Sequence, residues 1–440
     1  MHYVIIGNGV AGTTAAMTLR QRETDARITL ISGESDFFFS RTALMYAYMD
    51  RMDRRDLEPF ERKVYAKQNI QLIRDWVTDL DAAARTLRLK SGLSLGYDRL
   101  LLATGSLANG AAWEGLETAR EGVASFVTLQ DLDHCERLTP SSKEVVVVGG
   151  GLIGVELVEC LAFHRRKVTF LVREPWYWPA ALAREEAEMV TAHIRRHGVD
   201  VRLDEEVAQV FSGADGRVRA VKTRAGNEFP CQLLGIAVGV HPAIEWLRQV
   251  KTPPLSRRGI AVQPDFTTSL ENVWAAGDCA EFDRGGKPVV EQIWYTARRQ
   301  GELAARSMLG DAITYDPPLF YNSAMFFDIE YTTVGMVNDV PAGGASFFFR
   351  IPGQDVSVRI VEHNGAVAGF NMLGSRWNHT ILERWIRERR TMDYVMGRLA
   401  EAQFDVEFGR VNLAAAAASY ADWNSGRRRD SEEPQAVAKD

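Results

Sequence analysis

Cysteine is scarce in this chain: its 440 residues include four, Cys135, Cys160, Cys231 and Cys279. No two of them form a CxxC or CxxxxC pattern, so the sequence indicates neither a cysteine metal site nor a local redox disulfide. The stretch FFFSRTALMYAYM, Phe37 to Met49, contains no cysteine at all. Few and unpaired thiols suit a reducing compartment, and we predict a cytoplasmic protein.

Long apolar runs and an excess of positive charge are also missing. No run approaches the ~20 residues that a membrane helix needs, and MHYVIIG enters an expected strand too early for a signal peptide. The formal net charge is -6, whereas nucleic acid requires a basic surface. We therefore predict no membrane span and no nucleic-acid partner.

Histidine patterns add no metal signal. The eight histidines show no spacing that we interpret as metal-ligating, and we predict no metal. Three of them stand close to arginines and are expected on solvated helix faces: His164, His193 and His197.

Two glycine-rich turns are the strongest positive signal. Gly7, Gly9 and Gly12 form G-x-G-x-x-G between an apolar run and a helical segment. In such a turn the first glycine allows the bend, the second lets backbone approach a pyrophosphate, and the third lets helix and strand pack closely. The helix N-terminus then offers free N–H groups to the phosphates.

The same pattern returns at Gly149, Gly151 and Gly154, again between a buried apolar run and a helix. One dinucleotide needs one such turn, so two turns predict two dinucleotides. A flavin and a nicotinamide are the natural pair, because hydride passes between them. We predict FAD and NAD(P)H as cofactors.

The acidic residue that binds ribose is expected at the end of the second strand of each unit. Glu34 lies there in the first copy. In the second copy the position falls near Arg173, which would favour the 2′-phosphate of NADPH or else be a solvated strand end. Glu174 would instead suit a 2′-hydroxyl, so the choice between NADH and NADPH stays open.

The order of GNGVAG, LLATGS, VVVVGGGLIGVE and VWAAGDCAE resembles the pyridine nucleotide–disulfide oxidoreductase superfamily over roughly residues 1 to 315. The resemblance implies an α/β fold with two Rossmann-like dinucleotide-binding domains, for FAD and NAD(P), and an α+β C-terminal domain. The implied ranges are 1–110 and 241–315 for FAD, 111–240 for NAD(P), 316–424 for the interface domain and 425–440 for a disordered tail.

The resemblance also implies roles for single residues. Thr104 and Gly105 mark the crossover back to the FAD domain, and Gly277 and Asp278 reach the ribityl chain or phosphate of FAD. Glu156 lies near the nicotinamide, or else forms a helix salt bridge. Asp278 also suits a helix cap, and Trp294 either contacts the isoalloxazine or packs in a helix core.

The segment ISGESDFFFSRTAL is similar to the S-R-P-x-L segment of rubredoxin-, nitrite- and ferredoxin-reductase-like members. Arg41 then runs along the FAD. Related thiol-dependent members carry a nucleophilic cysteine where this chain has Thr42. The ferredoxin reductases have a Pro and a Lys where this chain has Thr42 and Tyr46. Loss of a Lys beside the flavin would weaken stabilisation of its reduced, anionic form.

These features predict an FAD-dependent NAD(P)H oxidoreductase that passes electrons to an external acceptor without a thiol relay. A small carrier, ferredoxin or rubredoxin, is the first candidate acceptor, and the protein is expected to be a homodimer. A slow redox sensor and a flavin relay subunit of a larger complex are the alternatives. The Arg-rich segment 376–390 either steers an acidic carrier or is a solvated helix face.

Overall fold

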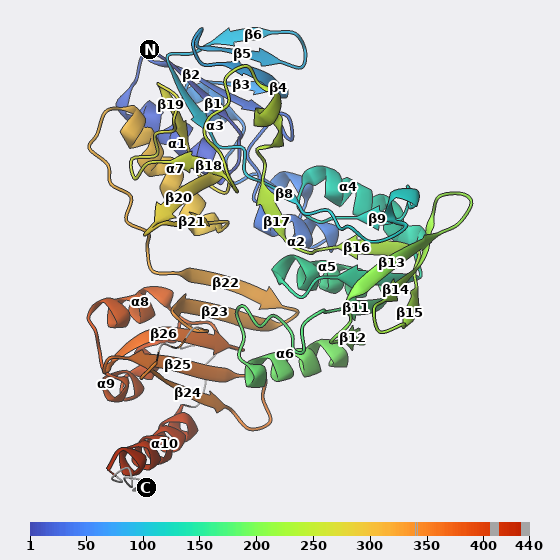
Figure 1. The fold of residues 1–440 in the computed structure, drawn as a ribbon. Coiled ribbons are helices and arrows are strands. Elements are labelled where there is room, and N and C mark those ends of the chain that lie inside the picture. The colour runs from blue at the N-terminus through green and yellow to red at the C-terminus, as the bar shows by residue number, and fades with distance from the viewer. Residues whose placement is uncertain (339, 341, 405–412, 433–440) are drawn as a thin grey trace, which may run out of the picture. The chain divides into compact units, whose positions relative to one another are not determined.

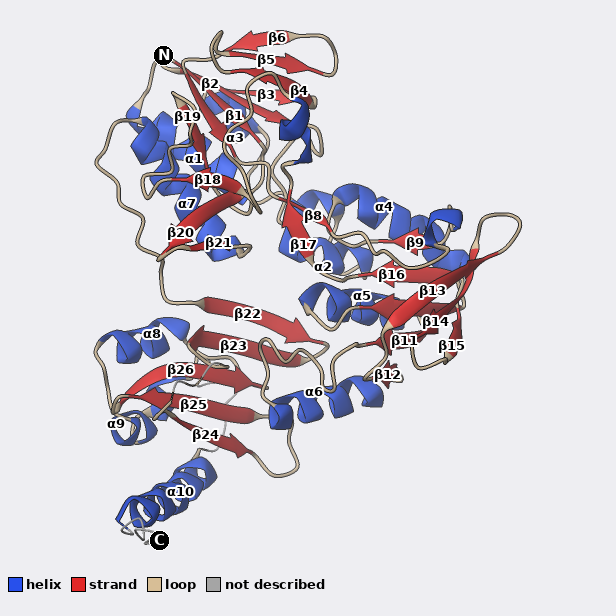
Figure 2. Cartoon of the chain, in the orientation of Figure 1, coloured by secondary structure: helices blue, strands red, loops and turns tan. Residues whose placement is uncertain are grey.

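The computed structural model describes residues 1–338, 340, 342–404 and 413–432, and the side chains of 427–432 are left aside. It consists of two compact units (Figure 1). Unit 1 comprises Met1–Leu171 and Glu205–Pro318, and unit 2 comprises Val172–Asp204 and Leu319–Asp440. Figure 2 shows the helices and strands of each.

The first sheet of unit 1 is parallel throughout, with the order β19-β7-β1-β2-β3. Its central strands are mostly apolar and buried, as expected for a sheet covered on both faces, whereas the edge strand β3 is largely part-exposed or exposed. They are β1 (His2–Ile6), β2 (Arg27–Ser32), β3 (Ile70–Arg74), β7 (Arg99–Leu102) and β19 (Val273–Ala275).

Two helices distant in sequence pack together beside this sheet, α1 (Val10–Arg22) and α7 (Trp294–Met308) (Figure 1). A Cβ atom on Gly301 of α7 would lie 2.2 Å from the Ala11 carbonyl oxygen, so only glycine allows this approach. The first sheet and its helices are thus built from the two ends of unit 1.

A second parallel sheet in unit 1 follows the order β11-β10-β16-β9. Its strands are β9 (Val123–Ala124), β10 (Glu144–Val148), β11 (Lys167–Leu171) and β16 (Leu233–Ile236). The accompanying helices are α4 (Leu129–Leu138) and α5 (Leu152–Phe163). Thr128 and Asp131 form a capping box that starts α4.

Shorter strands and helices complete unit 1. β5 and β6 form a hairpin before Thr104. β19 ends at Ala275, and Gly277 then turns the chain with φ 79°. The remaining elements are β4 (Val77–Asp81), β5 (Thr86–Leu89), β6 (Ser94–Gly96), β8 (Ser106–Ala108), β13 (Val207–Ser212), β14 (Val218–Thr223), β15 (Glu228–Pro230), β17 (Val240–Pro242), β18 (Ile260–Val262), β20 (Ala280–Arg284), β21 (Lys287–Val290), α2 (Leu44–Tyr48) and α3 (Lys63–Lys67).

Unit 2 is built on an antiparallel sheet with the order β22-β23-β26-β25-β24. Its strands are β22 (Tyr321–Phe326), β23 (Ile329–Gly335), β24 (Ala345–Arg350), β25 (Ser357–His363) and β26 (Ala366–Leu373). Its other elements are α6 (Arg184–Arg196), β12 (Asp200–Arg202), α8 (His379–Arg387), α9 (Met392–Met396) and α10 (Ala414–Glu432). The predicted tail, 425–440, begins inside α10, and residues 433–440 lie outside the described residues.

The Arg-rich segment 376–390 contributes both core and surface to unit 2. Trp377 and Trp385 are buried in the core of this unit. Arg387 pairs with Glu383 one turn away at 2.6 Å, on the exposed side of α8. The helix therefore has a solvated charged face, as one of our two interpretations predicted.

A buried ion pair holds α6 in unit 2. Arg359 of β25 donates from Nε and Nη2 to the two carboxylate oxygens of Glu186, each at 2.9 Å. Two further donors reach Glu186 Oε2: Asn371 Nδ2 at 2.9 Å and the Ala183 backbone N–H at 2.8 Å. Burial raises the pKa of Glu186, an effect that Arg359 opposes.

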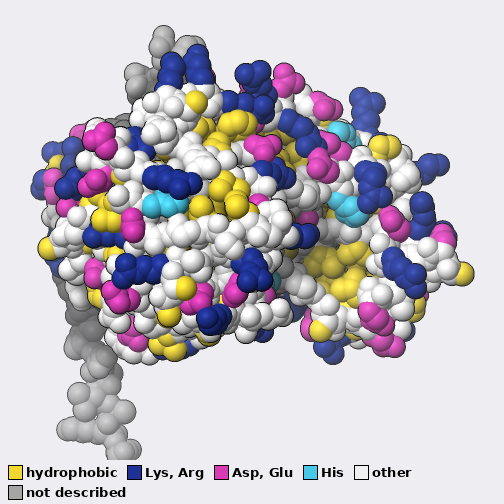
Figure 3. Space-filling view, turned by 90° about the horizontal axis from the view of Figure 1, so that it is seen from above, with side chains coloured by type: hydrophobic (Ala, Val, Ile, Leu, Met, Phe, Trp, Pro, Cys, Tyr) yellow, Lys and Arg dark blue, Asp and Glu magenta, His cyan; other side chains and the backbone are white. Residues whose placement is uncertain are grey.

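The surface of the protein mixes both signs of charge. On the face drawn in Figure 3, basic and acidic side chains are interspersed.

None of the described helices combines the length and the apolar character required to cross a bilayer.

Candidate dinucleotide sites

The first glycine turn follows β1 and is closed by tight backbone contacts. Gly7 donates its N–H to the Ile31 carbonyl at 2.8 Å. A Cβ atom on Gly7 would lie 2.0 Å from the Ala103 oxygen, and one on Gly12 would lie 1.9 Å from the Gly7 oxygen. These two glycines are therefore required by packing alone.

Gly9 differs, because a Cβ atom there would meet nothing within 4 Å. It is the N-cap residue of α1, and no side chain caps this helix end. The free N–H groups of the first helical turn thus have the open, small-residue surroundings that a pyrophosphate requires. The residues present fit a dinucleotide.

The second turn, after β10, repeats this geometry. Added Cβ atoms on Gly149 and Gly154 would lie 2.1 Å from the Ala237 oxygen and 2.0 Å from the Gly149 oxygen. Gly151 again has nothing within 4 Å and begins α5 without a side-chain cap. Each turn therefore contains two glycines that are required for packing and a third that faces open space.

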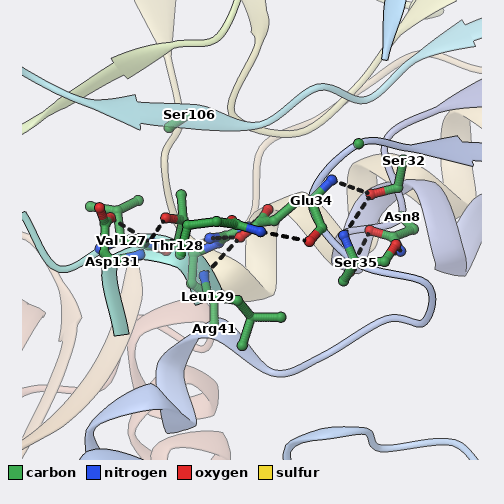
Figure 4. A network of polar contacts seen from close by, with 12 residues as sticks. Asn8, Ser32, Glu34, Ser35, Arg41, Ser106, Val127, Thr128, Leu129 and Asp131 are labelled. Atoms are coloured by element: carbon green, nitrogen blue, oxygen red, sulfur yellow. Dashed lines mark hydrogen bonds and ion pairs between the residues drawn. The ribbon is translucent and has the colours of Figure 1, made fainter. Parts of the chain in front are cut away.

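Glu34 and Arg41, both expected at FAD, pair with each other in the structure (Figure 4). Arg41 Nη1 donates to Glu34 Oε1 at 3.0 Å and Arg41 Nη2 to Oε2 at 2.7 Å. Asn8, inside the first glycine turn, donates to the Ser35 carbonyl at 2.9 Å. Asn8 thereby fixes the loop that carries Glu34.

The same network reaches the start of α4 and the residues just before it (Figure 4). The Leu129 N–H donates to Glu34 Oε1 at 3.2 Å, and Arg41 also donates to the Val127 carbonyl. Glu34 therefore accepts hydrogen bonds from the first turn of α4 as well as from Arg41. A ribose hydroxyl at Glu34 would share a carboxylate that already has these partners.

Asp278 comes after β19, next to the strand β7 that Thr104 and Gly105 follow. Ser106 donates to Asp278 Oδ2 at 2.9 Å, and Gln292 donates to the Ser106 hydroxyl at 2.8 Å. Burial raises the pKa of Asp278, while the Ser106 hydrogen bond and the Arg41 charge oppose the shift. Asp278 and Thr104 thus meet at the carboxyl edge of the first sheet, where α/β folds bind ligands.

Trp294 and Thr42 have fewer polar contacts than Glu34, Arg41 and Asp278. Trp294 is the first residue of α7, and its buried Nε1 has no hydrogen-bond partner among the described residues. The Arg298 guanidinium lies 6.0 Å from its ring centroid. Thr42 is exposed and shares a 3.1 Å hydrogen bond with Ser40.

Glu156 stands in the first half of α5 and is half-buried. Enclosure by the protein, and secondly the charge of Glu159, raise the pKa of Glu156 to about 8. Its carboxyl group is therefore neutral at pH 7, which differs from the helix salt bridge that we considered. Arg51 lies 3.8 Å from Glu159 rather than pairing with Glu156.

Arg173 belongs to unit 2 and is exposed, with a 2.8 Å ion pair to its neighbour Glu174. The two residues that we weighed for the ribose thus neutralise each other. In the adjacent WYW stretch, Trp178 packs on Phe326 and Tyr331. This contact gives Trp178 a packing role.

All four cysteines are buried as free thiols. Burial raises the pKa of Cys279, and likewise that of Cys231 to about 12. Cys160 has its pKa raised well above the usual value for the same reason. Because the thiolate is the reactive form, these cysteines are unsuited to a thiol relay.

The family model described as pyridine nucleotide-disulphide oxidoreductase matches residues 1–301. The chain belongs to this family. The match confirms the predicted superfamily, the α/β fold class and an oxidoreductase that uses FAD and NAD(P)H.

Several members of the pyridine nucleotide-disulphide oxidoreductase family are similar along most of the chain. A biphenyl dioxygenase system ferredoxin–NAD(+) reductase component from Paraburkholderia xenovorans is 31% identical over 70% of this chain and 75% of its own. A 5,5'-dehydrodivanillate O-demethylase ferredoxin reductase subunit from Sphingobium sp. is 28% identical, covering 90% and 92%. The solved ferredoxin reductase of the CYP199A2 system from Rhodopseudomonas palustris is 25% identical, with TM-score 0.77 over 85% of this chain and 91% of that chain.

Sequence reasoning missed part of this site. Ser106, Gln292 and the backbone of Val127 and Leu129 were not singled out. Ser106 directly follows Gly105 in LLATGS, so its position was a usable signal. The Leu129 N–H is a backbone group, so no residue type in the sequence could have indicated it. Its place in the network depends on where α4 begins.

Proposed function

We propose that this oxidoreductase passes electrons from FAD directly to a small redox protein of the ferredoxin or rubredoxin class. The burial of all four thiols carries the proposal, because it leaves no accessible cysteine as an intermediate stop. The names of the relatives support it, since they include ferredoxin and rubredoxin reductases. The cytoplasm and a homodimer remain parts of this proposal.

The proposed FAD contacts are Gly7, Gly9, Gly12, Glu34, Arg41, Thr42, Thr104, Gly105, Gly277, Asp278 and Trp294. The proposed contacts of the nicotinamide cofactor are Gly149, Gly151, Gly154, Glu156 and Arg173. When bound, FAD supplies the hydride acceptor and the route to one-electron carriers. The protein's part is to hold the phosphates at two uncapped helix ends and to orient the rings.

Rapid mixing of the FAD-loaded protein with NADH or NADPH under anaerobic conditions tests the first half-reaction. Fast loss of the visible flavin absorption with one donor is expected. Addition of oxidised ferredoxin or rubredoxin should then restore the absorption in the same instrument. Slow reduction with every donor would instead favour a redox sensor, and fast reduction without reoxidation by either carrier would contradict the proposed acceptor.

The donor preference has its own test. The choice between NADH and NADPH stays open: an Arg173 that meets the 2′-phosphate of NADPH predicts that Arg173→Gln lowers the preference for NADPH over NADH about tenfold, whereas an Arg173 at a solvated strand end predicts no change. The measurement is kcat/KM with both donors. A preference for NADH in the unaltered protein would contradict the first of these roles.

Glu156 should make flavin reduction pH-dependent. Its pKa is raised to about 8, so it is neutral below pH 8 and becomes a carboxylate above. We expect the apparent second-order rate of reduction by NAD(P)H to fall by up to ~tenfold per pH unit above this pKa, because the new carboxylate would repel the anionic dinucleotide as it binds. In Glu156→Gln the fall should be absent.

The same residue has a consequence for stability, and its sign is determined by the shift. The folded pKa is above the unfolded value, so the folded state retains a proton that the unfolded chain loses. The stability that the protonated Glu156 contributes is fully present below the ordinary carboxyl pKa of 4.5. It is lost as the pH rises to about 8. A Glu156→Gln profile with the same slope over this window would contradict the assigned pKa.

A further inference from the structure

Two histidines and one aspartate converge in unit 2, away from both glycine turns. His193 and His197 lie four residues apart on α6, and therefore on one helix face. Asp328 stands in the short turn between β22 and β23. One potential ligand atom from each of the three lies within 4.8 Å of the other two.

His193 is held in a defined orientation. It is 6% exposed, and its Nδ1 lies 2.8 Å from Asp355 Oδ2. Its Nε2 is buried and lies in ion-pair contact with Asp328. A histidine whose Nδ1 is engaged by a carboxylate, with Nε2 left for a ligand, is the usual arrangement of a metal-binding imidazole.

His197 has the same arrangement with a different partner. Its Nδ1 lies 3.1 Å from the His193 carbonyl oxygen, which makes Nδ1 the protonated nitrogen and Nε2 the one with a lone pair. Its ring stacks on Phe327, with the centroids 4.6 Å apart. The His197 imidazole is thus held in the tautomer that can ligate through Nε2.

We propose that His193, His197 and Asp328 bind Zn²⁺, with water as the fourth ligand. Two imidazoles and one carboxylate form a donor set that zinc accepts in tetrahedral geometry at ~2.0–2.2 Å. Such bonds place neighbouring ligand atoms about 3.4 Å apart. His197 and Asp328 are exposed, so their side chains have room to adjust to that spacing.

The surrounding charges suit a cation. Asp328 contributes one negative charge to the ion, and Asp355 contributes a second behind His193. Arg196 offsets part of this, since it pairs with Asp355. The bound ion would connect α6 to the β22–β23 turn and stabilise unit 2.

The proposal revises two interpretations of the sequence. His193 is not on a solvated face, because it is buried between Asp328 and Asp355. The spacing His-x-x-x-His was present in HIRRH, but two histidines alone do not form a site. The third ligand comes from a turn 131 residues further along the chain, counting from His197 to Asp328.

The test uses the tag-free, FAD-loaded full chain, stripped with a chelator and titrated with Zn²⁺ in a calorimeter. One equivalent should bind, and the melting temperature should rise with zinc. His197→Ala and Asp328→Asn should each weaken binding at least tenfold, because they remove a ligand without opening a buried site. His363→Ala, in β25 and outside the cluster, is the matched control and should bind as the unaltered chain does.

A second readout identifies the geometry. Replacing Zn²⁺ by Co²⁺ should give the visible absorption of a tetrahedral site in the unaltered chain and not in His197→Ala. No stoichiometric binding, or binding unchanged in both ligand variants, would overturn the proposal. Neither result depends on the electron acceptor, so failure here leaves the proposed reductase function untouched.

Discussion

Replacing Gly151 with alanine should weaken NAD(P)H binding by at least tenfold while leaving the fold and the FAD content intact. A Cβ atom at Gly151 meets no protein atom within 4 Å, and the residue is in extended backbone with φ -106°. Alanine is therefore accommodated by the protein, and it fills the space that a pyrophosphate needs at the start of α5. Tenfold corresponds to about 1.4 kcal/mol of binding free energy.

The same change at Gly9 should weaken the binding of FAD rather than that of NAD(P)H. Gly9 also has nothing within 4 Å, so Gly9→Ala should fold but lose FAD during purification. The measurements are the ratio of flavin to protein absorbance, and the dependence of the flavin reduction rate on NAD(P)H concentration. Gly110→Ala is the matched control, since Gly110 is equally open and lies outside both turns.

The paired design separates the two sites. If Gly151→Ala lost FAD and Gly9→Ala kept it, the two turns would have been assigned to the wrong cofactors. If neither variant changed either readout, the glycine turns would not bind the pyrophosphates. A change at Gly12 would be less informative, because its Cβ atom would collide with the Gly7 carbonyl in the absence of any ligand.

Arg359→Met should strongly destabilise unit 2, with a loss of ~3–5 kcal/mol in the free energy of unfolding. Methionine leaves the Glu186 carboxylate buried without its cation, although Asn371 and the Ala183 N–H still donate to it. Urea unfolding followed by tryptophan fluorescence measures the loss, because Trp377 and Trp385 report on this unit.

Three comparisons make this prediction specific. Adding Glu186→Gln to Arg359→Met should recover part of the loss, since it removes the unpaired charge. Arg387→Met breaks the exposed pair with Glu383 and should cost less than ~1 kcal/mol. Lower pH should narrow the gap between Arg359→Met and the unaltered chain, because protonation neutralises Glu186. A cost of Arg359→Met equal to that of Arg387→Met would contradict the argument.

The glycine turns were predictable from the sequence because their constraints are local. Each needs a buried strand, three glycines and a helix within about twenty residues, and both copies have these in order. Cys279 was likewise predictable as a buried side chain, since it stands among alanines after an apolar strand.

The pairings between distant segments were not predictable. Glu34 and Arg41 were each assigned to FAD, yet no pattern showed that they would bind each other or that α4 would begin beside Glu34. The partner of Glu186 lies 173 residues away on β25. The sequence of α6 shows that the helix has an apolar face, but it does not indicate which sheet that face packs against.

The split construction of the first sheet affects the order in which the protein is made. Its strand β7 ends at Leu102, whereas its neighbour β19 begins at Val273 and α7 ends at Met308. At ribosomal rates of ~5–20 residues per second, roughly 10 to 30 s separate the synthesis of these two neighbours. During that interval the edge of β7 opposite β1 has no strand beside it, whereas the last strand of the second sheet, β16, is already made by Ile236. Truncated chains that end before Val273 should therefore be the form most dependent on chaperones.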